Sequence, residues 1–158
     1  MLILQLILLI RNKNILFDFP KFDFEPVSII VPCYNESETI AKTIESLLNL
    51  DYPKEMIEII IVDDRSKDNS VEIIDEYTKK YSNVKLIVNK RNSGGAAEPT
   101  NIGIRAAKYN YVAVTDADSS PQPDTLKKML GFLQKDKKVA AVTCAVLAKN
   151  SKTFIQKL

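Results

Sequence analysis

The sequence predicts an α/β fold in which a mostly parallel sheet is flanked by helices, a Rossmann-like arrangement. Short β-branched apolar runs alternate with segments of helical periodicity, which is typical of βαβ units. The apolar runs are nearly continuous, as expected for strands covered by helices on both faces. The chain has 158 residues, 46% of them hydrophobic and 27% charged. Those values favour a single packed domain over a disordered chain.

The expected elements follow in a regular order from residue 27 onward. Strands are expected over residues 27–31, 58–64, 84–89, 111–118 and 139–147. Helices are expected over residues 37–50, 68–81, 98–108 and 123–136. Pro32 should end the first strand, and Ser37 should cap the first helix, with Glu38 in its first turn. An Asp or Asn should cap the second helix.

Polar residues gather where four of the predicted strands end. These positions are Pro32 to Glu36, Asp63 to Ser66, Asn89 to Gly95, and Asp116 to Asp118. In open parallel sheets, ligands bind just beyond the carboxyl ends of the strands. We therefore expect the functional site at this edge.

Composition excludes several classes of function. The net charge is +2, from 22 basic and 20 acidic residues, so nothing indicates a nucleic-acid partner. Histidine is absent, which excludes histidine bases and histidine metal ligands. A metal site would need oxygen ligands or the cysteines. Cys33 and Cys144 are far apart in sequence and are expected to be reduced and inert.

The acidic pair Asp116 and Asp118 indicates how phosphates could be bound. Neither GxGxxG nor GxxxxGK[ST] is present, and the first strand-to-helix turn, PCYNESE, has no glycine. Two carboxylates repel a diphosphate unless a divalent cation lies between them. Mg²⁺ or Mn²⁺ suits such oxygen ligands and commonly combines one or two carboxylates with substrate phosphates.

Four stretches in this order resemble family 2 glycosyltransferases of the GT-A fold, over residues of about 25–150. They are VSIIVPCYNE, IIIVDDRSKDNS, NSGGAAEPTNIGI and DADSSPQPDTL. The last looks like the metal-binding DXD motif of that family. The resemblance implies a nucleotide-sugar-binding domain over residues 25–150, preceded by a segment at 1–24 and followed by the start of a truncated helix at 151–158.

The resemblance also implies roles for individual residues. Asp118 would hold the metal, and Asp116 would contact the sugar, the ribose, the metal or a metal-bound water. The other implied nucleotide-binding residues are Pro32, Tyr34, Glu36, Asp63, Asp64, Gly94, Gly95 and Asn101. Of these, the two acids would meet the base and ribose, and the two glycines would allow the backbone close to the ligand.

Purely structural roles remain open as alternatives for three of these residues. Tyr34 could be a rim aromatic, Asp64 a helix cap or solvated turn, and Asn101 a loop tether. Many relatives carry a Lys where this chain has Gly95, or an Arg where it has Thr100. A contact to the donor could therefore be missing or supplied elsewhere.

The implied reaction is inverting transfer of a sugar from a nucleotide diphosphate sugar to an acceptor hydroxyl. A UDP-sugar is favoured, and a GDP-sugar is possible. The acceptor could be a lipid, a glycan or a protein. The general base is expected to be a carboxylate beyond Leu158. The alternative is a non-catalytic nucleotide-sugar-binding or scaffold subunit completed by a partner. A nucleotidyltransferase is disfavoured, because the first turn lacks a glycine-rich basic loop.

The amino terminus, MLILQLILLI, is apolar but short of the roughly 20 residues that span a bilayer. It could be half of a membrane helix, an interfacial anchor or a packed helix. The basic residues that follow it favour the cytoplasmic face of the membrane, or the cytoplasm, as the location. Residues 150–158 read as an interfacial or a surface helix.

Overall fold

The structure is a computed structural model that describes residues 20–144. The chain divides into two compact units, one of residues 23–127 and one of residues 1–22 with 128–158. The predicted site lies wholly in the first unit, which we call the sheet unit. The amino-terminal apolar run and residues 145–158 lie outside the described residues. Within the part that is described, no helix is long and apolar enough to cross a membrane.

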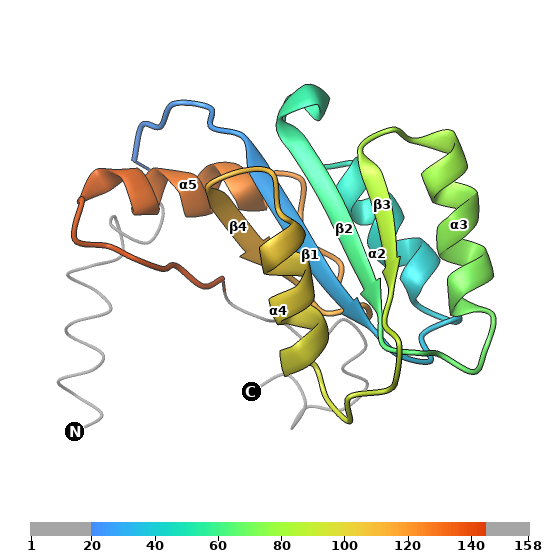
Figure 1. Ribbon diagram of the computed structural model, residues 1–158. Helices are drawn as coiled ribbons and strands as arrows, with labels where there is room; N and C mark the ends of the chain where they lie inside the picture. The colour runs from blue at the N-terminus through green and yellow to red at the C-terminus, as the bar shows by residue number, and fades with distance from the viewer. Residues whose placement is uncertain (1–19, 145–158) are drawn as a thin grey trace, which may run out of the picture. The chain divides into compact units, whose positions relative to one another are not determined.

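The sheet unit contains four parallel strands in the order β3-β2-β1-β4 (Figure 1). They are β1 (Val27–Cys33), β2 (Ile57–Asp63), β3 (Val84–Val88) and β4 (Tyr111–Val114). The chain proceeds outward from β1 to β3 and then returns to place β4 on the other side of β1. Strand order therefore reverses between β1 and β4, which makes that position the topological switch point.

Helices cover both faces of this sheet, as the sequence predicts. Helix α4 (Ala97–Ala106) lies on one face, and α2 (Ile40–Leu48) and α3 (Ser70–Lys80) lie on the other (Figure 1). A short 3₁₀ turn, η1 (Lys54–Met56), precedes β2. Helix α5 (Thr125–Lys135) follows the β4 loop and continues into the second unit.

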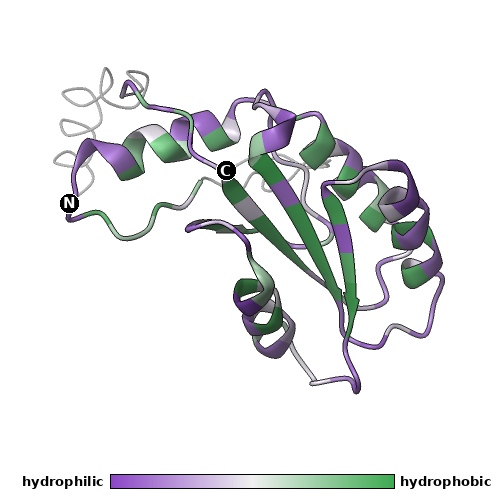
Figure 2. Ribbon diagram, turned by 45° about the horizontal axis from the view of Figure 1, so that its top comes forward, coloured by the Kyte–Doolittle hydropathy of each residue, from purple (hydrophilic) through white to green (hydrophobic). Residues whose placement is uncertain are grey.

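The central strands are buried along their whole length because both faces are covered. Every residue of β1 and β2 is buried, and Figure 2 shows the strands as mainly hydrophobic ribbons. On the α4 face, Ile30, Ile60 and Val62 form the core cluster. Gly103 of α4 packs directly on this cluster, since an added Cβ would lie 2.3 Å from Cγ2 of Ile30. A glycine is needed there for α4 to approach the sheet.

The expectation that Pro32 ends the first strand is wrong, because β1 continues to Cys33. In a β-strand, the backbone N–H and C=O of one residue point towards the same neighbouring strand. The carbonyl of Ile30 accepts from Thr115 on the β4 side, and that of Cys33 accepts from Asp64 on the β2 side. Pro32 therefore faces the β4 side, where β4 has already ended at Val114. Its missing N–H costs no ladder hydrogen bond.

Two other expectations about secondary structure are corrected. The cap position of α2 is Thr39, not Ser37, since residues 37–39 form a turn before the helix. Residues 139–144 form no strand, and Val139 is 36% exposed. An apolar run supplies side chains for burial, but a strand also needs a hydrogen-bonded neighbour, which the run does not specify. Residues 145–147 of that predicted strand lie outside the described part.

A buried carboxylate closes the amino-terminal end of the sheet. Glu58 is 4% exposed and accepts from Ser28 Oγ at 2.8 Å, from Lys85 Nζ at 2.6 Å and from the backbone N–H of Lys108 at 3.0 Å. Burial alone would raise the pKa of Glu58, but these hydrogen bonds lower it below its ordinary value. We call these four residues the amino-end network.

Candidate functional site

A pocket of about 440 Å³ opens at the carboxyl ends of the strands, at the switch point. All four strand-end segments contribute to it. The lining residues are Pro32, Cys33, Tyr34, Glu36, Asp64, Asn92, Gly94, Gly95, Ala96, Pro99, Asp116, Ala117 and Asp118. Of the ten predicted site residues, eight line this pocket, whereas Asp63 and Asn101 do not.

The first two loops of the pocket are hydrogen-bonded to each other. The backbone N–H of Asn35 donates to Ser66 Oγ at 2.9 Å, and the N–H of Lys67 donates to Asn35 Oδ1 at 2.8 Å. Asn35 and Arg65 both have left-handed backbone angles, with φ of 55° and 66°. Such angles are uncommon for residues other than glycine and cluster at functional sites. The crossed hydrogen bonds hold the loop that presents Tyr34, which is 42% exposed.

Asp68 and Ser70 extend this connection to the starts of two helices. Asp68 accepts from the backbone N–H groups of Ser37 and Ser70, each at 3.0 Å, and from Ser70 Oγ. Ser70 Oγ in turn accepts from the N–H of Glu36 at 2.9 Å. Burial would raise the pKa of Asp68, but these donors lower it to about 2. An Asp or Asn was expected to cap this helix: Asn69 occupies the cap position but makes no side-chain cap hydrogen bond, and Asp68, one residue earlier, accepts from the N–H of Ser70.

Asp63 lies beneath the pocket and not on its wall. It is fully buried, and its Oδ2 accepts from the N–H of Ser66 at 3.0 Å. Its Oδ1 is buried without a hydrogen-bond partner among the described residues. Burial and the nearby Asp63 carboxylate raise the pKa of Cys33 to about 12. Cys33 is therefore a neutral thiol, in agreement with the expected inert cysteine. A contact between Asp63 and the base stays a prediction.

Asp64 anchors the loop between β3 and α4 (residues 89–96), which we call the third loop, and it also lines the pocket. It is 3% exposed and accepts from Asn89 Nδ2 and from the N–H and Oγ of Ser93, all at 2.8 Å. Burial would raise the pKa of Asp64, but these three donors lower it. A carboxylate has about four acceptor positions, so one remains for a ligand. The residue is neither a helix cap nor a solvated turn.

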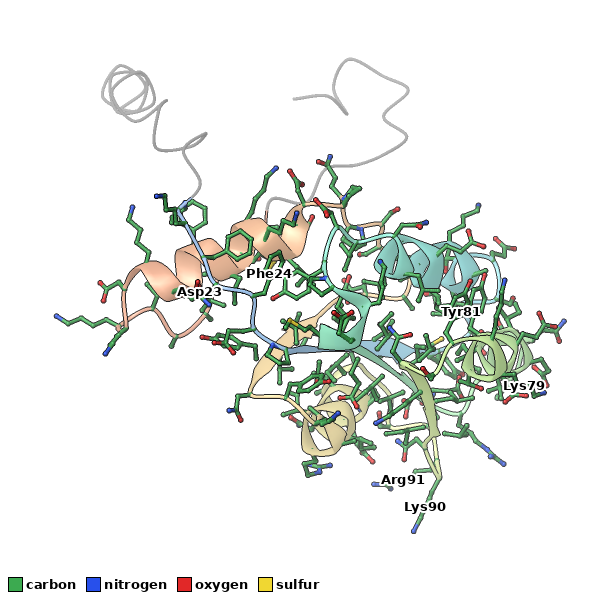
Figure 3. The ribbon with its side chains drawn as sticks, turned by 90° about the horizontal axis from the view of Figure 1, so that it is seen from above. Asp23, Phe24, Lys79, Tyr81, Lys90 and Arg91 are labelled. Atoms are coloured by element: carbon green, nitrogen blue, oxygen red, sulfur yellow. The ribbon has the colours of Figure 1, made fainter. Side chains whose placement is uncertain are left out.

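The glycine pair of the third loop leaves open space beside the backbone. Gly94 has φ of 82°, a left-handed angle that its lack of a side chain permits. A Cβ added to Gly94 or Gly95 would meet no atom within 4 Å. A ligand could therefore approach this backbone closely. Lys90 and Arg91, earlier on the same loop, are exposed and extend away from the ribbon (Figure 3).

Asp116 and Asp118 lie in the loop that follows β4, and both are exposed in the pocket wall. Within residues 20–144, no hydrogen bond or ion pair engages either carboxylate. Within that same range, no group of three or more acidic or cysteine side chains is close enough to hold a metal ion. The pair offers two carboxylates, without a third protein ligand beside them in the described residues. It fits Mg²⁺ or Mn²⁺ only where a bound phosphate completes the coordination.

Sequence reasoning missed several pocket residues. Cys33, Asn92 and Ala117 lie within the strand-end segments expected at the site but were given no role there, and Ala96 and Pro99 lie outside those segments; all five line the pocket. Their neighbours in the motifs were the available signal. Asn101, by contrast, is exposed on α4 and outside the pocket lining. Its predicted contact to the donor stays a prediction.

Several known proteins are similar to this chain in sequence. Residues 28–158 match the family described as Glycosyl transferase family 2. A poly(ribitol-phosphate) beta-glucosyltransferase of Bacillus spizizenii is 41% identical over 106 residues, which cover 67% of this chain and 17% of the relative. A poly-beta-1,6-N-acetyl-D-glucosamine synthase of Staphylococcus epidermidis is 36% identical over 149 residues, or 93% of this chain and 35% of the relative. The chain thus spans well under half the length of these relatives.

Solved structures agree with the sequence relatives. S. aureus TarS in complex with UDP-GlcNAc matches with a TM-score of 0.64 and 34% identity, over 70% of this chain and 31% of that chain. The mannosyltransferase PcManGT from Pyrobaculum calidifontis, in complex with GDP-Man and Mn²⁺, matches with a TM-score of 0.70 and 29% identity, over 89% of this chain and 42% of that chain. The predicted fold and family are both confirmed, and the chain belongs to glycosyl transferase family 2.

Proposed function

We propose that the sheet unit binds a nucleotide diphosphate sugar together with a divalent cation, and that the protein transfers the sugar to an acceptor hydroxyl. One observation carries this proposal. A single pocket at the switch point joins the unpaired carboxylates Asp116 and Asp118 to the first-loop residue Tyr34 and to Asp64. The pocket thus has an aromatic and acceptor end suited to a nucleoside, and an acidic end suited to a cation.

The charges of the pocket support a cation requirement. Its lining includes Glu36, Asp64, Asp116 and Asp118, and no Lys or Arg. A diphosphate would be repelled by these carboxylates, because like charges in a partly desolvated site interact unfavourably. Mg²⁺ or Mn²⁺ held by Asp116 and Asp118 would neutralise the charge that develops on the leaving diphosphate. The missing Lys at Gly95 makes this compensation more important.

Each end of the pocket has a distinct role in this proposal. Tyr34 would pack against the base, and the free acceptor position of Asp64 would take a donor from the base or ribose. The backbone at Gly94 and Gly95 would let the ligand lie close to the loop. None of these residues is assigned as the general base, for which a carboxylate elsewhere in the protein is still expected.

The relatives support a choice of donor and acceptor for this proposal. We favour a UDP-sugar, since the structural relative TarS is in complex with UDP-GlcNAc, whereas GDP-Man accompanies Mn²⁺ in PcManGT. The sequence relatives are named for making or modifying polymers, so we favour a growing polymer over a protein or lipid as the acceptor. Association with the cytoplasmic face of a membrane stays part of the proposal.

Calorimetry of the 158-residue chain with UDP, with and without Mn²⁺, tests the proposal. We expect UDP to bind only with Mn²⁺, more tightly than GDP, and Asp118→Ala to weaken binding at least tenfold. Glu76→Ala is the matched control, because Glu76 is an exposed carboxylate on α3, outside the pocket lining. No binding of either nucleotide by a folded sample would favour the scaffold function instead.

A further inference from the structure

Thr43 links helix α2 to residues 116–118 after β4, which we call the acidic loop because they contain Asp116 and Asp118. Its side chain is 1% exposed, and its Oγ1 donates to the carbonyl oxygen of Ala117 at 2.7 Å. The same hydroxyl lies 3.4 Å from the carbonyl of Thr39 in its own helix. A hydroxyl has one proton, and the shorter contact receives it. The hydroxyl of Thr43 is therefore committed to the acidic loop.

Ala117 is the residue between the two pocket carboxylates. The last ladder contact of this segment is the N–H of Thr115 donating to Ile30 at 3.0 Å, and the N–H of Ser119 closes a turn onto Asp116 at 3.1 Å. Ala117 lies between these points and is 5% exposed. Its carbonyl belongs to the peptide unit that carries the N–H of Asp118. Because a peptide unit is planar, a bond that fixes this carbonyl also fixes the backbone on which the Asp118 side chain is mounted.

We propose that Thr43 is a positioning residue for the cation and diphosphate end of the pocket. Its hydroxyl holds the Ala117 peptide so that the carboxylates of Asp116 and Asp118 face the pocket together. The inference rests on the proposed function, since it gives Thr43 an effect on cation-dependent nucleotide binding. Thr43 itself does not line the pocket.

Two substitutions separate positioning from packing. Thr43→Val keeps the shape of the side chain and removes the hydroxyl, which leaves the buried Ala117 carbonyl without its donor. Thr43→Ser keeps the hydroxyl and removes the methyl group, which leaves a small cavity. If Thr43 only supports packing, UDP affinity should follow the stability of each variant. If Thr43 positions the acidic pair, UDP affinity should depend on whether the hydroxyl is present.

The measurement is UDP affinity by calorimetry over a series of Mn²⁺ concentrations, with unfolding transitions on the same samples. We expect Thr43→Val to weaken Mn²⁺-dependent UDP binding about tenfold and to need more Mn²⁺ for half-saturation. Thr43→Ser should stay within about threefold of the original chain, even where it lowers the unfolding midpoint more than the valine does. Equal binding by Thr43→Val and the original chain, or equal losses in both variants, overturns the inference.

Amide NMR spectra without ligand provide a second readout. We expect Thr43→Val to shift the Asp118 amide signal, and Thr43→Ser to preserve it. An unchanged Asp118 signal in a folded Thr43→Val sample also overturns the inference. If the original chain binds no UDP with Mn²⁺, the proposed function fails and this inference fails with it. If the original chain binds and the valine variant binds equally, only the inference fails.

Discussion

The amino-end network, built around the single carboxylate of Glu58, and the acidic pair Asp116 and Asp118 lie at opposite ends of one sheet, and their surroundings differ. Glu58 is buried and accepts from three donors, including the cation of Lys85. Asp116 and Asp118 are exposed in a pocket, with neither carboxylate engaged by a hydrogen bond or ion pair in the described part of the chain. A folded chain must satisfy the polar groups that it buries, whereas carboxylates left open are available to a ligand.

Asp64 combines both properties, because it is a hydrogen-bonded, buried carboxylate that also lines the pocket. It lines the pocket, yet three donors of the third loop already engage it. We therefore expect the amino-end network to determine stability, the acidic pair to determine binding, and Asp64 to affect both. Substitutions at these positions test that division.

The largest effect is expected from Glu58→Ala. The variant leaves the buried Ser28 hydroxyl and the partly buried N–H of Lys108 without their acceptor, and it removes the partner of the Lys85 ammonium group. Each lost partner costs roughly 1 kcal/mol, so the free energy of unfolding should fall by about 3 kcal/mol. Urea denaturation measures this change. UDP affinity of the folded protein should not change. A loss below about 1 kcal/mol would contradict a stabilising role for this network.

Asp118→Ala should show the opposite behaviour. The side chain is exposed, so the free energy of unfolding should stay within about 0.5 kcal/mol of the original value. Mn²⁺-dependent UDP affinity should fall at least tenfold, which is about 1.4 kcal/mol. Denaturation and calorimetry on one preparation measure both quantities. A clear loss of stability would mean that the acidic pair also holds the fold together.

Asp64→Asn should reduce both quantities moderately. The amide has one acceptor oxygen in place of two, so at least one of the three donors loses its partner. We expect a loss of about 1–2 kcal/mol in unfolding free energy. We also expect about fivefold weaker UDP binding, because the third loop lines the pocket. Faster exchange of the Ser93 amide should accompany both changes, and a fall in only one quantity would separate the two roles of Asp64.

Acid should weaken the connection between the first two loops through Asp68. Its pKa is lowered to about 2 from the ordinary value of 3.8, so the folded state favours the charged carboxylate. The resulting stability is fully present above pH 4 and is lost as the pH falls towards 2. Partial exposure limits the contribution to about 1 kcal/mol. The loss of stability between pH 5 and 2.5 should therefore be smaller in Asp68→Asn than in the original chain, and equal losses would exclude this role.

The smallest effect is expected from Asn101→Ala. Asn101 is exposed on α4 and does not line the pocket, although the family resemblance implies a role for it. Loss of its amide should change UDP affinity by less than about twofold. Calorimetry measures the UDP affinity of Asn101→Ala and of Asp118→Ala in parallel, so that the two losses can be compared. A loss approaching that of Asp118→Ala would show that α4 contributes directly to the donor site.

Most of the sheet could be predicted, since continuous apolar runs such as residues 59–62 specify buried strands. The failures have physical causes. Pro32 remains in β1 because its side of the strand has no neighbour at that level, which depends on where β4 ends. Ser37 is not the cap because residues 37–39 form a turn and α2 begins only at Ile40, while the Ser37 N–H donates to Asp68, 31 residues away. Residues 139–144 carry the right side chains but show no strand.

The sequence by itself determined the fold class, the family and the residue types gathered at the strand ends. Apolar periodicity sets the elements, and parallel topology brings their carboxyl ends to one edge, while the family was inferred from the resemblance of four motifs. Only the tertiary structure decided which of those residues are engaged and which are open. Asp64 is occupied by a loop 29 residues away, and Ala117 is held by a hydroxyl 74 residues away. Contacts at such separations depend on how the chain folds back on itself, and no local pattern records them.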